Sequence, residues 1–144
     1  MLELLDTGLI YRNPQPARKS IHAWHPTLAL LDNGDLMAAY DLAEAIAAVD
    51  YGTYCARSTD GGVTWSEPVR FFEDREDEEV NHTVRISRLA DGTLIGAGHR
   101  RYSYHPEVGG WNPETYGVEP GEWFVLHSVD GTDWKGPEEM VPPI

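Results

Sequence analysis

The stretch Ser58-Thr59-Asp60-Gly61-Gly62-Val63-Thr64-Trp65 decides the fold of this chain. The side chain of Asp60 can accept hydrogen bonds from backbone N–H groups of its own turn. Gly62 can adopt the left-handed conformation that such a turn requires. We expect Trp65 to fold back and pack against a sheet. The pattern Ser-x-Asp-x-Gly-x-Thr-Trp is specific, and its fixed positions are Ser58, Asp60, Gly62, Thr64 and Trp65.

The chain repeats this landmark and a second one. Ser128-Val129-Asp130-Gly131-Thr132-Asp133-Trp134 is a shortened copy of the turn, with Ser128, Asp130 and Trp134 at the matching positions and Asp133 where Thr is expected. Likewise, Leu31-Asp32-Asn33-Gly34-Asp35-Leu36 reads like Leu89-Ala90-Asp91-Gly92-Thr93-Leu94. An internal repeat of a few dozen residues is typical of propellers and solenoids.

Each repeat is predicted to contain four short strands joined by glycine turns. Asn-Gly and Asp-Gly between apolar runs favour hairpins, because their turns need positive φ angles. The expected strands cover residues 27–31, 36–40, 53–57 and 65–72, then 83–89, 94–99, 123–128 and 138–141. Residues 42–49 are rich in Ala and predict a short helical turn. The predicted fold is all-β, with about two four-stranded antiparallel blades of a β-propeller.

This organisation predicts three segments. Residues 1–20 form an N-terminal strand that would close a propeller ring by completing its last blade. Residues 21–73 form the first blade, with the turn motif at 58–65. Residues 74–144 form the second blade, with the degenerate motif at 128–134.

Composition excludes several classes of protein. With 41% hydrophobic residues the chain can build a core, and its formal charge of −13 disfavours binding to nucleic acid or anionic membranes. The acidic run at 73–79 reads as a solvated loop, or as a cation site if other elements fix its carboxylates. Cys55 is the single cysteine, so no internal disulfide forms. The sequence shows neither a membrane-spanning apolar run nor a signal peptide, which makes a cytoplasmic location the default expectation.

The two turn motifs resemble the Asp boxes, or BNR repeats, of the sialidase superfamily, whose members are six-bladed propellers. The resemblance covers nearly all of the chain. It implies that the Asp boxes are structural and lie on the face opposite an active site. It also implies that this chain is the N-terminal portion of a longer enzyme and is inactive alone. Two blades would leave open faces, which favours self-association.

The resemblance places candidate site residues on the rim away from the Asp boxes. Asp50 and Asp41 are the candidate catalytic carboxyls. The candidate substrate-binding residues carry aromatic, imidazole or guanidinium groups: Trp24, His25, His82, Arg85 and Arg100. Trp24-His25-Pro26 stands where a sialidase has Arg-Ile-Pro, so sialic acid is not the implied substrate.

Structural alternatives exist for the same residues. Either aspartate can cap a turn, the histidines can be structural hydrogen-bonding groups, and Trp24 can belong to an inter-blade core. Arg100 and Arg101 can offset local acidic charge. His22 and His25 suggest a metal only if a third ligand joins them, so no metal and no cofactor are expected.

Two functions follow from these residues. The first is a sialidase-like glycoside hydrolase acting on a saccharide. The alternative is a non-catalytic propeller that binds carbohydrate or protein.

Overall fold

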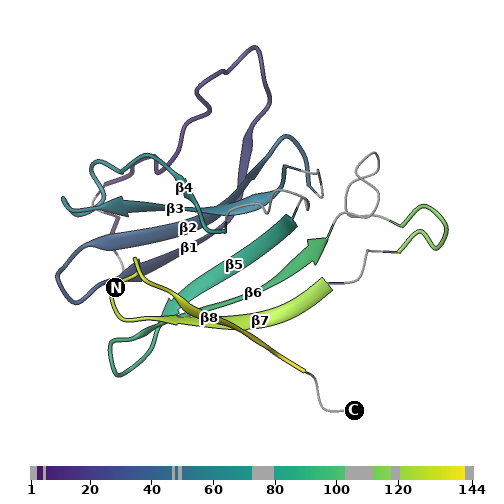
Figure 1. The fold of residues 1–144 in the computed structure, drawn as a ribbon. Helices are drawn as coiled ribbons and strands as arrows, with labels where there is room; N and C mark the ends of the chain where they lie inside the picture. Colours follow the sequence, from purple (N-terminus) through teal and green to yellow (C-terminus); the bar gives the residue numbers. More distant parts are fainter. Residues whose placement is uncertain are drawn as a thin grey trace.

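The computed structural model contains two antiparallel sheets of four strands each, which confirms the all-β prediction and matches two propeller blades (Figure 1). It describes residues 3–4, 6–46, 48, 50–72, 80–102, 112–117 and 121–141. The first sheet consists, in order, of β1 (His22–Leu30), β2 (Leu36–Ala43), β3 (Gly52–Ser58) and β4 (Val69–Arg70). The second consists of β5 (Val80–Arg88), β6 (Leu94–Tyr102), β7 (Gly121–Ser128) and β8 (Lys135–Glu139).

The first two strands of each sheet are joined by the predicted glycine turns. Gly34 has a φ of 89° and Gly92 a φ of 93°, a region that residues with a Cβ seldom occupy. The amide of Leu31 donates to the Asp35 carbonyl at 2.8 Å, and the second sheet repeats this bond at 2.7 Å. The turns therefore set the register of both hairpins, in which Leu30 pairs with Leu36.

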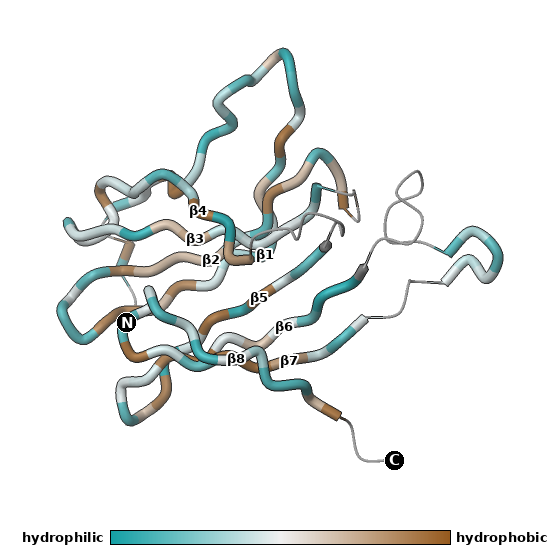
Figure 2. Tube along the Cα trace, in the orientation of Figure 1, coloured by the Kyte–Doolittle hydropathy of each residue, from teal (hydrophilic) through white to brown (hydrophobic). Residues whose placement is uncertain are grey.

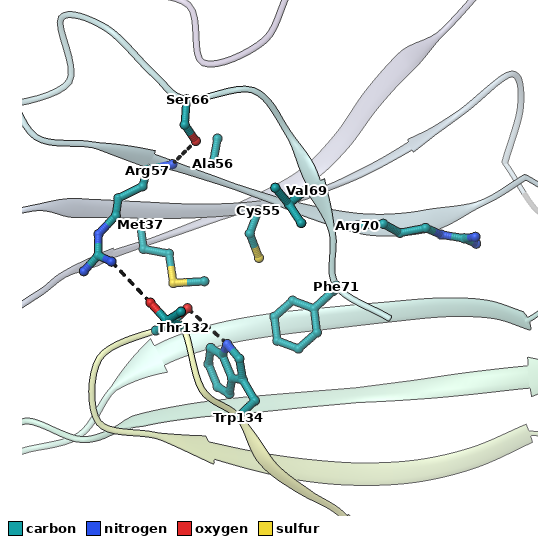
Figure 3. Close-up of a pocket in the computed structure, with 11 residues that line it drawn as sticks. Met37, Cys55, Ala56, Arg57, Ser66, Val69, Arg70, Phe71, Thr132 and Trp134 are labelled. Carbon is teal, nitrogen blue, oxygen red and sulfur yellow. Dashed lines mark hydrogen bonds between the residues drawn. The ribbon is translucent and has the colours of Figure 1, made fainter. Parts of the chain in front are cut away.

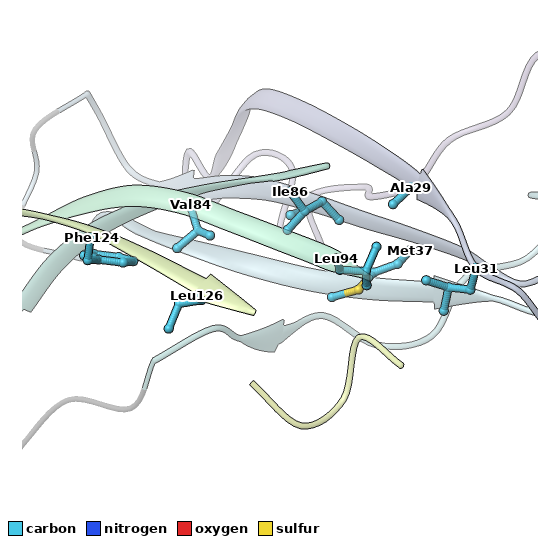
Figure 4. Close-up of a cluster of buried hydrophobic side chains, with 9 residues drawn as sticks. Ala29, Leu31, Met37, Val84, Ile86, Leu94, Phe124 and Leu126 are labelled. Atoms are coloured by element: carbon cyan, nitrogen blue, oxygen red, sulfur yellow. The ribbon is translucent and has the colours of Figure 1, made fainter. Parts of the chain in front are cut away.

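The core lies between the two sheets (Figure 4). Side chains alternate along a strand, so Met37 and Ala39 of β2 face the second sheet. Val84, Leu94 and Phe124 approach them from that sheet and are almost fully buried. Burial of such side chains stabilises the pairing of the blades by about 1.5–3 kcal/mol each. Figure 2 shows apolar segments along the strands and a largely hydrophilic turn between β1 and β2.

A second apolar cluster covers the other face of the first sheet. Ala38, Tyr40 and Leu42 alternate with the residues that face the core, and Ile10 and Tyr11 of the N-terminal segment pack on them. The rings of Tyr11 and Tyr40 lie 5.9 Å apart. The described residues between positions 3 and 20 form no strand, because they pack through side chains instead of pairing with a sheet edge. Their role in closing a ring stays a prediction.

Two other local predictions were wrong. The fourth strand of the first sheet, expected at 65–72, is only Val69–Arg70. It cannot start earlier because Trp65 folds back onto the turn and Pro68 has no N–H to donate. The helical turn expected at 42–49 is also absent from the described residues, since Leu42 and Ala43 extend β2 through pairing. What remains is a loop in which the Ala48 amide donates to the Ala45 carbonyl at 3.2 Å and the Tyr51 amide to the Ala48 carbonyl at 3.1 Å.

No helix in the described part of the chain is long and apolar enough to cross a membrane.

Candidate functional site

The turn at residues 58–65 is held together by its own side chains. The Ser58 hydroxyl donates to Asp60 Oδ1 at 2.8 Å and accepts from the Gly62 amide at 2.8 Å. Thr64 donates to Asp60 through its amide at 2.9 Å and through its hydroxyl at 2.6 Å. Trp65 Nε1 donates to the Gly62 carbonyl at 3.1 Å. These contacts give each fixed position of the motif a structural task within the turn.

The shortened turn at residues 128–134 keeps this geometry without the threonine. The amides of Thr132 and Asp133 donate to Asp130 at 2.8 and 3.1 Å, and the Ser128 hydroxyl lies 3.2 Å from the same oxygen. Trp134 Nε1 donates to the Gly131 carbonyl at 3.2 Å. Backbone amides thus replace the missing hydroxyl, which is why the degenerate motif still forms a turn.

Thr64→Val is expected to raise the pKa of Asp60 from about 2 toward its ordinary value of 3.8. The Thr64 hydroxyl is the largest cause of the lowered pKa, followed by the Thr64 amide and Ser58. Because the pKa is lowered in the folded protein, the stabilisation is complete above pH 3.8 and is lost as pH falls through about 2. NMR titration of the side-chain carboxyl groups measures the pKa of Asp60 in the variant and in the wild type. Thr59→Val is the matched control, and an Asp60 pKa that shifts equally in both variants would contradict the assignment.

Arg57, which the sequence did not single out, joins the turn between β1 and β2 to the turn at 128–134. Arg57 Nε lies 2.9 Å from Asp35, and its Nη2 donates to the Asp130 carbonyl of the other blade at 3.2 Å. Beside it lies a cavity of about 270 Å³ between the blades, lined among others by Met37 and Trp134 (Figure 3). Its walls are mostly apolar. At the end of the sheets that carries the turn motifs, Arg57 and the cavity therefore lie at the contact between the two blades.

The strand register places the candidate site residues Asp41 and Arg100 at the end of the sheets opposite the two turn motifs. Leu36 pairs with Ser58 at the turn-motif end of β2, whereas Asp41 pairs with Thr53 five residues further along. In the second sheet, Leu94 pairs with Ser128, and Arg100 pairs with Glu122. The described strands thus separate Asp41 and Arg100 from both turn motifs.

Asp41 is the buried centre of a polar cluster, which we call the Asp41 cluster: Asp41, Arg85, His25, Tyr51 and Thr53. Asp41 has no exposed surface. It accepts from the Thr53 hydroxyl at 2.6 Å and the Tyr51 hydroxyl at 2.8 Å. Arg85 Nη1 donates to it at 3.0 Å, and Nη2 forms an ion pair with its second oxygen. The Asp41–Arg85 pair therefore connects the first blade to the second.

The pKa of Asp41 reflects this environment. Burial alone would raise it, but hydrogen bonds from Arg85, Thr53 and Tyr51, together with the Arg85 charge, outweigh burial and lower it. Burial and the bond to Asp41 also raise the pKa of Tyr51. At neutral pH, Asp41 is thus a buried carboxylate and Tyr51 a neutral hydroxyl.

His25 reaches the cluster because β1 is irregular at that point. The pairing of β1 with β2 shifts between Trp24 and Thr27, and His25 has a φ of 49°. Pro26 cannot donate to the ladder, which favours a bulge. His25 Nδ1 then lies 3.2 Å from both Asp41 and the Tyr51 hydroxyl.

Trp24 lies at the edge of the same cluster. Its ring stacks on Tyr51 with centroids 5.9 Å apart and an interplanar angle of 24°. His22 packs on the Trp24 ring at 5.3 Å. Trp24 remains half-buried, so it presents an aromatic surface next to buried charge. Such a combination suits a polyhydroxylated ring that has apolar faces and polar edges.

Three predicted site residues lie outside this cluster. Asp50 is exposed and accepts from the Glu44 amide at 3.2 Å, as expected for a loop cap. Arg100 Nε donates to Glu122 at 2.6 Å. His82 is 1% exposed, with Nε2 3.3 Å from the Thr53 carbonyl and its ring against Phe72, so it packs inside the molecule.

Sequence reasoning missed Tyr51 and Thr53, the two hydroxyl partners of Asp41. A usable signal was present, because Tyr51 directly follows the predicted loop and Thr53 begins the predicted third strand. Among the described residues, no three His, Cys, Asp or Glu side chains are grouped closely enough to hold a metal ion. His25 is instead engaged by Asp41 and Tyr51.

Two four-stranded antiparallel sheets, each with a hydrogen-bonded aspartate turn before its last strand, match two blades of a β-propeller. A protein of unknown function from Dyadobacter fermentans DSM 18053 is similar, with a TM-score of 0.61 and 23% identity over 93% of this chain and 38% of that one. The Hadza microbial sialidase Hz136 has a TM-score of 0.55 and 22% identity over 79% of this chain and 25% of its own. At these identities the likeness shows the fold alone.

The chain therefore spans well under half the length of both solved structures. No protein-family model matches the sequence. No curated protein matches it either.

Proposed function

We propose that this chain provides a saccharide-binding rim of a sialidase-like glycoside hydrolase. The observation that carries the proposal is the Asp41 cluster, in which a partly buried ion pair is bordered by the half-buried Trp24 ring. Sugars are typically bound by an aromatic face combined with fixed polar groups. The distant structural likeness to a sialidase supports the same class of ligand.

Within this proposal the two candidate carboxyls have different roles. Asp41 is enclosed and ionised, so it orients Arg85, Tyr51 and Thr53 and does not donate a proton to a leaving group. Asp50 is open to solvent and is the remaining candidate for the general acid. Arg85 keeps 33% of its side chain exposed and is the candidate for contact with the sugar.

A non-catalytic saccharide-binding propeller is the second candidate. One observation favours it: the central carboxylate is fully engaged by hydrogen bonds and an ion pair. A binding site needs no titrating acid, whereas glycoside hydrolysis usually requires two carboxyl groups on either side of the scissile bond.

Replacing Trp24 with Ala is expected to weaken saccharide binding by about tenfold or more, which corresponds to about 1.4 kcal/mol. Isothermal titration of the full chain with a panel of neutral and acidic monosaccharides measures this effect. Val63→Ala is the control, because Val63 is exposed at the opposite end, in the turn motif. Unchanged affinity in the Trp24 variant, or no binding of any saccharide, would remove the proposal.

Hydrolysis of a panel of aryl glycosides by a complete propeller that carries this chain separates the two candidates, because two blades are expected to be inactive alone. Turnover that Asp50→Asn abolishes supports the hydrolase. Saccharide binding without turnover supports the non-catalytic propeller.

A further inference from the structure

A small cavity of about 140 Å³ lies beside the Asp41 cluster and has no role in the function proposed above. Tyr51 forms part of its wall, and the rest comes mainly from the neighbouring ends of β5 and β6. The volume is below that of ordinary small-molecule pockets, which measure about 300–1,000 Å³. Its size suits one substituent of a ligand better than a whole ligand.

The wall of the cavity is mostly apolar in area, and most of the polar side chains on it come from paired positions of β5 and β6. In the register of β5 and β6, Asn81 lies opposite Arg101, and Thr83 lies opposite His99. Directly opposed residues of antiparallel strands share one face of the sheet. Positions two apart also share a face, so Arg85 lies on the same side. Five polar residues thus gather at one end of this sheet.

Arg101 is the unusual member of the array. Arg57, Arg85, Arg88 and Arg100 each form an ion pair with a carboxylate. The side chain of Arg101 is half-buried and makes no ion pair or hydrogen bond with the described residues. Burial lowers its pKa, as expected for a guanidinium moved away from water. A guanidinium that no carboxylate among the described residues neutralises is notable in a chain with a formal charge of −13.

His99 adds a second unused polar atom. Its Nε2 is buried and has no hydrogen-bond partner among the described residues. The ring stacks on Trp123 with centroids 5.1 Å apart. Burial, Arg101 and Arg85 lower the pKa of His99, and only Asp41 opposes them. A bound anion would accept a hydrogen bond from this nitrogen and neutralise the surrounding positive charge.

We infer that this cavity is a subsite for the sulfate or phosphate ester of a saccharide, with Arg101 as its anchor. The inference rests on the saccharide-binding function proposed above. A planar carboxylate can be matched by one guanidinium fork, whereas a tetrahedral ester uses donors that approach from several directions. Arg101 provides the fork, His99 and Thr83 supply donors beside it, and Arg85 contributes positive potential. The sugar ring stays outside, next to Trp24.

The first test uses inorganic sulfate and inorganic phosphate as probes for the full chain at constant ionic strength. Both are expected to bind more tightly than acetate, and Arg101→Gln is expected to weaken them by about tenfold. Arg18→Gln is the control, since Arg18 is exposed in the N-terminal segment. Sulfate is also expected to raise the pKa of His99 in NMR titrations, because a nearby anion favours the imidazolium. Equal sulfate affinity in wild type and Arg101→Gln would overturn the inference.

The second test compares galactose with its sulfate ester and separates this inference from the function on which it rests. The ester is expected to bind more tightly to wild type, and Arg101→Gln is expected to remove the difference while keeping affinity for galactose. Equal affinity of wild type for both sugars overturns the subsite and leaves the saccharide-binding function standing. Binding of neither sugar overturns both. The Arg101 side chain has no partner among the described residues, so Arg101→Gln should keep the wild-type melting temperature, and an unfolded variant would contradict this assignment.

Discussion

Asp41→Ala is expected to lower the free energy of unfolding by about 3 kcal/mol, at the lower end of the cost of breaking a buried pair. The substitution leaves Arg85 without its counter-ion and removes the acceptor for the Tyr51 and Thr53 hydroxyls. Because the Arg85 side chain keeps 33% of its surface exposed, water compensates part of the loss. Urea unfolding followed by tryptophan fluorescence measures the change.

Two further variants test whether the ion pair causes this loss. The double variant Asp41→Ala/Arg85→Met is expected to recover part of the stability, because it leaves no buried unpaired charge. Asp50→Ala is the matched control and should change stability by less than about 0.5 kcal/mol, since Asp50 is exposed. A double variant less stable than the sum of its single variants would show that the pair itself is not the source.

The dependence of stability on pH has a definite sign. The pKa of Asp41 is lowered in the folded protein, so its stabilisation is present above the ordinary value of 3.8 and is lost as pH falls below it. Asp41→Ala should therefore show a smaller loss of stability on acidification than wild type.

Most of the fold follows from short-range chemistry that a sequence displays directly. The turn at 58–65 closes through bonds that span at most four residues, so Ser58, Asp60 and Thr64 predict it without knowledge of the rest. Gly34 and Gly92 fix the hairpins by the same local logic. Predictions failed where tertiary pairing competed with local preference, as at Leu42 and Ala43, which begin the Ala-rich segment but belong to β2.

The candidate site depended on longer-range geometry. Topology predicts that Asp41 and Arg85 lie at one end, but their contact requires the two blades to pack at a particular distance and angle. The alternation of side chains along a strand explains why Arg100 lies outside the Asp41 cluster. Arg100 follows His99 on β6 and so points to the opposite face, where it meets Glu122. His25 reached the cluster through a bulge that the sequence signals only as Pro26.

Phe124→Ala is expected to lower the free energy of unfolding by about 3–5 kcal/mol, the usual cost of removing a buried aromatic side chain. Phe124 is 1% exposed and lies in the core between the sheets. Its ring makes an edge contact with Phe72, with centroids 5.4 Å apart. Phe72 follows the last strand of the first blade, so the lost volume opens a cavity at the contact between the blades.

Trp123→Ala is the matched control for Phe124→Ala, because both residues lie on β7. Trp123 precedes Phe124 on β7, points to the other face and is 60% exposed, so its removal should cost less than about 1 kcal/mol. If the core couples the blades, Phe124→Ala will still unfold in one transition at a lower urea concentration, because neither sheet keeps its apolar face covered without the other. Two separate transitions would mean that each sheet folds alone. The Asp41–Arg85 pair would then be a contact between two independent units, and Asp41→Ala would leave both transitions in place.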